Sequence, residues 1–313
     1  MTKAKPPGPE DRAQRHYVIA GQSIEAGRIA PGLHIVATPI GNLGDITLRA
    51  LATLAGADLI ACEDTRVTHK LLSRYAIDTP LTPYHDHNAA AARPKLLRRL
   101  AEGASIALVS DAGTPLVSDP GYKLVREAQE AGQVVTALPG ASAVLTALTL
   151  AGLPTDQFLF AGFLPPKQAA RRGRIAELAR VQATLVLFET GPRVATALAD
   201  LADGLGHREA ALCRELTKLH EEFRRGDLAS LTQGCATGEV RGEIVLVIAP
   251  PTVARPSADD ADALLRRALS RVSLKDAVGE VAVATGLPRR ELYQRALILA
   301  EEENRETSLG APR

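Results

Sequence analysis

Residues 105–121 read SIALVSDAGTPLVSDPG, an apolar run that leads into a loop containing two prolines and two glycines. The run Ser105–Val109 predicts a buried strand. Proline fixes φ and lacks an N–H, whereas glycine permits positive φ and lets another molecule approach the backbone. A rigid loop with accessible backbone after a strand is where open α/β sheets bind ligands, although a tight surface turn has the same composition.

The rest of the chain alternates strand and helix patterns, which predicts an α/β protein with mostly parallel or mixed sheets. The expected strands are Leu33–Ala37, Asp58–Cys62, Ser105–Val109, Val134–Leu138, Phe158–Phe163, Ala183–Phe188, Glu209–Cys213 and Ile244–Ile248. The expected helices are Thr47–Ala55, Val67–Tyr75, Ala89–Ala101, Gly121–Ala131, Arg171–Val181 and Val194–Ala202.

We expect four segments: a mostly flexible extension (1–31), of which Tyr17–Ala20 could dock, two α/β domains (32–152 and 153–251) and a helical appendage (257–313). We expect the joint between the two domains at Ala151–Pro154. Within the appendage, Ser273–Leu297 resembles a helix-turn-helix whose second helix carries Arg289, Arg290 and Arg295. Acidic and basic residues balance there, which favours a packed helical pair, or at most an RNA contact.

Bulk composition excludes several classes of protein. The net charge is +1, so a polyanion site must be a local patch, and 3% aromatic residues disfavour base-stacking platforms. Three widely spaced cysteines form no zinc motif and indicate a reducing, cytoplasmic setting. No apolar run is long enough to span a membrane, and His85–Asn88 (HDHN) supplies too few ligands for a metal site.

Four loops follow predicted strands: Thr38–Asp45, Glu63–Arg66, Ser110–Gly121 and Pro139–Ser142. Because the carboxyl ends of parallel strands share one edge of a sheet, these loops should converge on one crevice. The chain has neither a P-loop nor a GxGxxG motif. A pocket built from backbone amides and carbonyls suits an adenine and an amino-acid group.

Five ordered blocks carry a more specific signal: LHIVATPIGNLGDITLRAL, ACEDTR, SDAGTPLVSDPG, ALPGASAVLTAL and ELTKLHEEFRRG. In this order they resemble the tetrapyrrole-methylase superfamily, and most closely its ribosomal branch, from about Leu33 to Pro250. The resemblance implies a two-domain fold, a homodimer, S-adenosylmethionine (SAM) between the domains, and 2′-O-methylation of a cytidine in 16S rRNA of the small ribosomal subunit. The residues that it assigns to the cofactor are Pro39, Ile40, Gly113, Thr114, Pro115, Val117, Ser142, Ala143, Phe188, Leu216, Thr217 and Glu243.

The third loop departs from the superfamily pattern. Tetrapyrrole methylases carry Gly-Asp-Pro where this chain has Gly113-Thr114-Pro115, and ATPIGNLGD replaces their glycine-rich first loop. Both departures favour an RNA substrate. Two alternatives stay open: a small-molecule methyltransferase acting on a tetrapyrrole-type ring, and a nucleic-acid-binding regulator that uses the α/β part as a ligand sensor.

Methyl transfer to a hydroxyl needs alignment of the reacting atoms and is helped by a base. Asp64, Asp111 and Glu189 are the candidate bases, each near a predicted strand end. Asp64 could instead pair with Arg66, and Glu189 with Arg193. Local basic clusters are the expected contacts for rRNA phosphates. Their residues are Arg93, Lys95, Arg98 and Arg99 in the first cluster, and Lys167, Arg171, Arg172 and Arg174 in the second.

Overall fold

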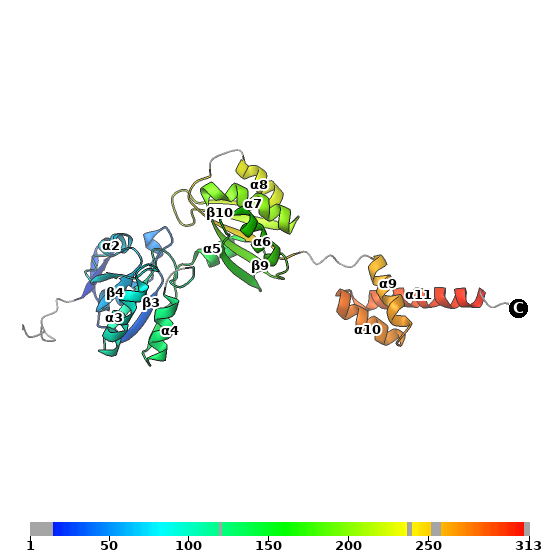
Figure 1. Cartoon of the computed structure of the whole chain (residues 1–313), viewed down its shortest axis with the longest axis horizontal. Coiled ribbons are helices and arrows are strands. Elements are labelled where there is room, and N and C mark those ends of the chain that lie inside the picture. Colours follow the sequence, from blue (N-terminus) through cyan, green and yellow to red (C-terminus); the bar gives the residue numbers. More distant parts are fainter. Residues whose placement is uncertain (1–14, 119–120, 237–239, 252–257, 310–313) are drawn as a thin grey trace, which may run out of the picture. The chain divides into compact units, whose positions relative to one another are not determined.

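The computed structural model describes residues 15–118, 121–236, 240–251 and 258–309. The chain divides into two compact units, residues 1–251 and 252–313, which are described separately (Figure 1). The larger unit contains two five-stranded sheets and a two-stranded one. Its further division into two domains at Ala151–Pro154 stays a prediction.

The first five-stranded sheet is parallel throughout and has the strand order β5-β4-β6-β3-β7. Its strands are β3 (Gly32–Val36), β4 (Leu59–Cys62), β5 (Leu81–Pro83), β6 (Ser105–Val109) and β7 (Val135–Leu138). The associated helices are the 3₁₀ helix η1 (Leu43–Asp45), α1 (Leu48–Gly56), α2 (Thr65–Arg74), α3 (Ala89–Ala101), α4 (Tyr122–Glu130) and α5 (Ala143–Ala151).

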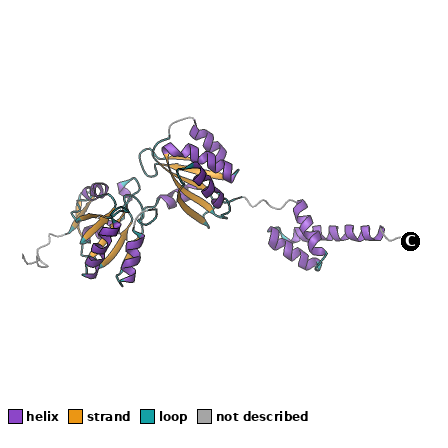
Figure 2. Ribbon diagram, viewed as in Figure 1, coloured by secondary structure: helices purple, strands orange, loops and turns teal. Residues whose placement is uncertain are grey.

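Helices cover both faces of this sheet (Figure 2). One face packs against α1 and α2 around Leu51, Ile60 and Leu72. The other packs against α3 and α4 around Leu100 and Leu124. Strands buried on both faces need continuous apolar runs, and β3, β4 and β6 are fully buried. Such runs made the strands predictable.

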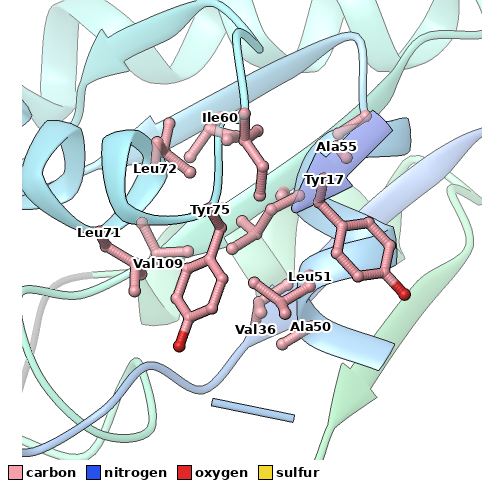
Figure 3. Close-up of a cluster of buried hydrophobic side chains, with 14 of the residues drawn as sticks. Tyr17, Val36, Ala50, Leu51, Ala55, Ile60, Leu71, Leu72, Tyr75 and Val109 are labelled. Carbon is pink, nitrogen blue, oxygen red and sulfur yellow. The ribbon is translucent and has the colours of Figure 1, made fainter. Parts of the chain in front are cut away.

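Residues 15–31 differ from the expected flexible extension. The strands β1 (His16–Ile19) and β2 (Gln22–Glu25) form an antiparallel hairpin, and the Tyr17 ring is buried in the same apolar cluster as Leu51 and Tyr75 (Figure 3). The turn residues Ala20 and Gly21 have φ of 50° and 77°, which fits the tight hairpin turn that favours glycine at its second position. The hairpin departs from a flexible extension over residues 15–31 but agrees with docking of Tyr17–Ala20. Residues 1–14 lie outside the described part of the chain.

The second five-stranded sheet is mixed, with the order β11-β10-β12-β9-β8. Only β8 and β9 pair in parallel; the other neighbours are antiparallel. Its elements are β8 (Phe158–Phe163), α6 (Gln168–Leu178), β9 (Thr184–Thr190), α7 (Gly191–Leu205), β10 (Glu209–Arg214), β11 (Glu222–Asp227), α8 (Leu228–Ala236) and β12 (Glu243–Ile248). Helices α6, α7 and α8 contribute to the core on one face, and α5 contributes to the core on the other.

The smaller unit contains α9 (Ala258–Leu269), α10 (Leu274–Thr285) and α11 (Arg289–Leu309) around a shared apolar core. Ser273 caps α10 by accepting a hydrogen bond from the N–H of Asp276, and Gly286 ends the helix with φ of 67°. Arg295 forms an ion pair with Asp262 of α9 at 2.7 Å. The expected helix-turn-helix is thus present, and Arg295 helps to hold it together. None of the described helices is long and apolar enough to cross a membrane.

Candidate functional site

Hydrogen bonds join the four predicted loops at the carboxyl edge of the parallel sheet. Thr38 and Gly113 exchange backbone hydrogen bonds of 2.9 and 3.0 Å, which links the first loop to the third. The Thr114 hydroxyl donates to the carbonyl of Ala141 in the fourth loop at 3.3 Å. The N–H of Asp64 in the second loop donates to Oδ1 of Asp111 at 2.9 Å. The loops therefore converge, as the sequence predicted.

A cavity of about 330 Å³ lies where these loops meet the second five-stranded sheet. Its size falls within the usual range of ligand pockets, about 300–1,000 Å³. Most of the residues assigned to the cofactor line it. They are Ile40, Gly113, Thr114, Val117, Ser142, Ala143, Phe188, Leu216 and Glu243. Pro39, Pro115 and Thr217 are not among the lining residues but are chain neighbours of residues that are.

The third loop owes its shape to unusual backbone conformations. Gly113, Leu116 and Ser118 have φ of 76°, 73° and 64°. Non-glycine residues rarely adopt such values, and they persist only where the surrounding structure enforces them. A Cβ on Gly113 would meet protein atoms no closer than 3.4 Å, so this glycine is required by its φ rather than by crowding from the protein. Proline and glycine thus build a rigid wall with accessible backbone.

The loop at residues 215–218, which follows β10, contacts the first loop. The N–H of Asn42 donates to the Thr217 hydroxyl at 3.1 Å, and a Cβ on Gly41 would overlap the side chain of Lys218. Glu215 and Thr217 also have positive φ, at 49° and 66°. Positive φ values therefore occur in the third loop and on both sides of the lining residue Leu216.

Ion pairs hold the loop at residues 215–218 in place. The Lys218 ammonium lies 2.8 Å from Oε1 of Glu215 and 2.9 Å from Oε2 of Glu243. The hydrogen bond from Lys218 is the main reason why the pKa of Glu215 lies below its usual value. Glu215 also accepts from the N–H of Glu243, where a side chain on Gly242 would collide with the carboxylate.

The three candidate bases occupy different environments. Asp64 caps α2 and is bound through two atoms of the Arg66 guanidinium, which holds the pKa of Asp64 at about 2. A carboxylate with such a low pKa and a charged partner is a poor proton acceptor. Asp64 also does not line the cavity. The geometry therefore favours the helix-capping role of Asp64 over a catalytic one.

Glu189 also lines the cavity, but its side chain is buried. Side chains alternate along a strand, so Glu189 shares the face of Leu187, which packs against α7. Its Oε1 lies 3.2 Å from Nε of Arg193, and Oε2 has no hydrogen-bond partner among the described residues. Burial raises the pKa of Glu189. The bracing of Glu189 by Arg193 is thus the alternative that the geometry favours.

Asp111 is the candidate that lines the cavity with an exposed side chain. One oxygen accepts the hydrogen bond from Asp64, which orients the carboxylate. The other oxygen, Oδ2, accepts none of the hydrogen bonds found among the described residues. Among the three predicted bases, Asp111 has the most suitable position.

The sequence reasoning missed several lining residues, notably Phe163, Cys213 and Val245. The rings of Phe160 and Phe163 each pack edge-on against Phe188, with centroids 4.8 and 5.6 Å away. Cys213 is fully buried, and burial raises its pKa to about 12. Alternation along the strands that hold Phe188 and Cys213 was the available signal, because it places every second residue on the cavity side.

The arginines of the second predicted RNA cluster form ion pairs within the protein. Arg171 is buried and lies 2.7 Å from Asp200, and Arg172 binds the other oxygen of the same carboxylate at 2.7 Å. Arg174 pairs with Glu177 at 2.7 Å. Arg171 and Arg172 therefore join α6 to α7 by providing the charged partners that the buried Asp200 carboxylate needs. Lys167, which is exposed before α6, is the member without an ion pair in the described chain.

The first predicted RNA cluster is divided. Arg93 pairs with Glu127 of α4 at 2.8 Å, and its side chain is only 18% exposed. Lys95, Arg98 and Arg99 are exposed. However, Arg98 and Arg99 lie in the last turn of α3, which precedes the start of β6 and hence the edge of the sheet opposite the cavity. No cluster of His, Cys, Asp or Glu suited to a metal occurs among the described residues.

Comparisons with known proteins show which family the chain resembles. Residues 32–232 match the Tetrapyrrole (Corrin/Porphyrin) Methylases, and residues 255–300 match the RsmI C-terminal HTH domain. Two similar proteins are called ribosomal RNA small subunit methyltransferase I. One, from Mesorhizobium japonicum, is 49% identical over 90% of this chain and 97% of its own length. The other, from Erythrobacter litoralis, is 54% identical over 87% of this chain and 96% of its own length.

The chain belongs to the tetrapyrrole methylases, in the branch of ribosomal RNA small subunit methyltransferase I. Solved tetrapyrrole-methylase-like structures share the fold. Diphthine synthase aligns with a TM-score of 0.55 at 17% identity, over 69% of this chain and 89% of its own. Uroporphyrin-III C-methyltransferase from Thermus thermophilus aligns with a TM-score of 0.51 at 22% identity, over 70% of this chain and 94% of its own.

The cavity lies mostly in the part of the chain that carries the family match. It joins the loops of the parallel sheet to the second sheet, and every strand of the two sheets except β12 lies within the residues that the family model matches. The lining combines apolar side chains such as Ile40 and Val245 with accessible backbone at Gly113. These features fit SAM, which has an adenine to enclose and an amino-acid group to hydrogen-bond.

Proposed function

We propose that this chain transfers a methyl group from SAM to the ribose 2′-oxygen of a cytidine in 16S rRNA of the small ribosomal subunit. The observation that carries the proposal is the cavity where loops of both sheets meet, in a chain that is about half identical to small-subunit rRNA methyltransferases over most of its length. SAM, when bound, supplies an activated methyl group on a sulfonium. Transfer forms the O–CH₃ bond, breaks the S–CH₃ bond and leaves S-adenosylhomocysteine and one proton.

The protein's contribution is alignment, which can supply a large part of the acceleration for an activated donor. We assign the walls of the cofactor site to the lining residues named above. The backbone of Gly113 and Thr114 would face the amino-acid group, and Phe188 with Val245 would enclose the adenosine. A rigid third loop lowers the cost of ordering the site when both substrates bind.

Asp111 is the residue that we assign to the proton of the 2′-hydroxyl. Its Oδ1 is held by the N–H of Asp64, and its Oδ2 is the oxygen available to accept a proton at the cavity. Asp64 positions Asp111 through this backbone hydrogen bond. Glu189 and Arg193 act further away by bracing the end of β9 against α7.

We also propose that the protein acts as a homodimer in the cytoplasm. Apolar side chains on α5 and on edge strand β8 support the dimer: Leu145 is 53% exposed, Leu150 is 44% exposed and Phe158 is 42% exposed. Light scattering of the purified protein tests the assembly directly. A monomer at micromolar concentration would contradict this part of the proposal and leave the activity unaffected.

The decisive experiment is ribose-methylation mapping by mass spectrometry of small-subunit rRNA from cells with and without this gene. We expect one cytidine to lose its 2′-O-methyl group and to regain it on incubation with the purified protein and SAM. A matching rRNA with 2′-deoxycytidine at that position should bind and accept no methyl group. Methylation of the deoxy substrate, which would have to occur on the base, would contradict the ribose assignment. A tetrapyrrole as the sole acceptor would instead establish the small-molecule alternative.

A further inference from the structure

Helix α2 starts at the rim of the candidate site. Its N-cap residue, Asp64, donates its backbone N–H to the cavity-lining carboxylate of Asp111. The helix then continues through Thr65–Arg74 along the α1 side of the parallel sheet. Whatever contacts the first turns of α2 is therefore close to the cavity.

One face of α2 is basic from end to end. Thr68, Leu71 and Leu72 are buried against the sheet, whereas Arg66, Lys70 and Arg74 are exposed. The three exposed cations are four residues apart, so they form a row with steps of about 6 Å along the helix axis. We call this row the α2 ridge. His69 lies beside it and is hydrogen-bonded to Ser73 at 2.8 Å.

The charge of the ridge is available for a partner. Helix α2 contains no acidic residue, and Lys70 and Arg74 form none of the ion pairs found in the described chain. Arg66 pairs with Asp64, but its side chain is 86% exposed, and such surface pairs contribute little to stability. The helix places no acidic side chain among these three cations. Such a row suits binding of a polymer with regularly spaced negative charges, such as a nucleic-acid backbone.

The other basic clusters are less well placed. The arginines of α6 are engaged with Asp200 and Glu177, and Arg93 is engaged with Glu127. Arg98 and Arg99 are exposed, but they lie at the opposite edge of the sheet from the cavity. Among these basic groups, the α2 ridge is the one whose helix begins next to a cavity-lining residue, because the N-cap Asp64 is hydrogen-bonded to Asp111.

We propose that the α2 ridge binds the phosphates of the RNA strand that carries the methylated ribose. This inference rests on the proposed function, because it takes the substrate to be RNA. The ridge would bind the backbone without reading bases, and it would set the direction in which the strand leaves the cavity. Phosphate contacts of this kind fix register and orientation.

The test compares two double substitutions with equal charge change in the full-length protein. Lys70→Glu with Arg74→Glu reverses the ridge beyond its first residue, and Arg98→Glu with Arg99→Glu is the matched control at the far edge of the sheet. The probe is deproteinised small-subunit rRNA, with intact small subunits as a second probe. Binding is measured by filter retention over a series of salt concentrations, together with the methylation rate.

We expect the ridge variant to bind rRNA at least tenfold more weakly and to lower the slope of log affinity against log salt by about two. Its affinity for S-adenosylhomocysteine should not change, and the control should resemble the parent protein. Equal rRNA affinity and salt slope in the ridge variant and the parent would overturn the inference, as would a larger loss in the control. If the parent protein itself failed to methylate rRNA, the proposed function would fail instead.

Two further measurements show whether weaker binding comes from lost phosphate contacts, from unfolding of the variant, or from repulsion between the new glutamates and the RNA. Thermal unfolding of the ridge variant should match that of the parent, because Lys70 and Arg74 are exposed. Lys70→Gln with Arg74→Gln removes the charges without reversing them, and it should give a smaller loss of affinity in the same direction. Retention of full affinity by this neutral variant would also overturn the inference.

Discussion

The backbone N–H of Asp64 donates a 2.9 Å hydrogen bond to Oδ1 of Asp111, and this contact separates the roles of two neighbouring carboxylates. Asp64 is already bound to Arg66 and caps α2, whereas Asp111 lines the cavity. One carboxylate is therefore engaged with Arg66, and the other is exposed at the cavity, where we propose that it meets the substrate.

Replacing Asp111 with Asn should reduce the rate of methyl transfer about 10²-fold or more, the usual effect of losing a catalytic base. The Asn carbonyl can still accept the hydrogen bond from Asp64, so the loop and the affinity for S-adenosylhomocysteine should be retained. Single-turnover transfer of labelled methyl to rRNA measures the rate. Asp64→Asn is the matched control, because Asn caps helices as well as Asp. Equal rates for both variants would refute the assignment of Asp111.

Gly113→Val should abolish binding of SAM and of S-adenosylhomocysteine. The backbone of Gly113 has φ of 76°, and a branched side chain there would both strain the loop and project beside the backbone that the ligand approaches. Gly103→Val provides the control: it has φ of 84°, and no atom lies within 4 Å of an added Cβ. Both variants should lose about 1–2 kcal/mol of folding free energy from the left-handed conformation. Calorimetry should then show ligand binding only for the Gly103 variant.

The parallel sheet and the converging loops could be predicted because their arrangement follows from features that are visible within short stretches of sequence. Buried strands such as Ser105–Val109 must be apolar throughout, and the loops after them must share an edge. The hairpin at residues 16–25 was missed because Tyr17 and Ile19 give only a short alternating pattern. The Ala20–Gly21 turn was the stronger signal, since glycine suits its second position. Strand β11 was missed because its half-exposed pattern (EFRRGD) resembles a polar loop.

The interaction partners of individual charged side chains could not be predicted from the sequence. In the sequence, Arg171 and Arg172 resemble an exposed basic cluster. Their partner Asp200 is far away in the sequence, on the next helix, α7. Glu189 was a candidate base until the alternation of β9 placed its side chain on the face of Leu187. In both cases the deciding fact is which face of an element a side chain occupies.

Arg171→Ala should destabilise the protein by about 3 kcal/mol, because it leaves the buried Asp200 carboxylate with Arg172 as its remaining charged partner. Burial alone would raise the pKa of Asp200, but the hydrogen bonds from Arg172 and Arg171 lower it below the usual value. A depressed pKa contributes stability above the unfolded-state pKa, near 4, and that contribution is lost as the pH falls through the folded-state value. The difference between Arg171→Ala and the parent should therefore be full at pH 7 and shrink in acid.

Urea unfolding at several pH values measures that difference. Arg174→Ala is the comparison, since its partner Glu177 is 68% exposed and the pair should contribute less than about 1 kcal/mol. Equal losses in the two variants at pH 7 would show that the Asp200 pair contributes no more than a surface pair.

Cys213 should resist alkylation in the folded protein. It lines the cavity but is fully buried, and burial raises its pKa to about 12. At pH 8 only about one thiol in ten thousand would then be the reactive thiolate. Iodoacetamide at pH 8, followed by peptide mass analysis, should find Cys213 unmodified in the native protein and modified once urea unfolds it. S-adenosylhomocysteine should shift the urea concentration needed for labelling upward, because a ligand that binds only the folded state stabilises it. Rapid labelling of Cys213 without urea would show that the cavity opens more widely than this structure does.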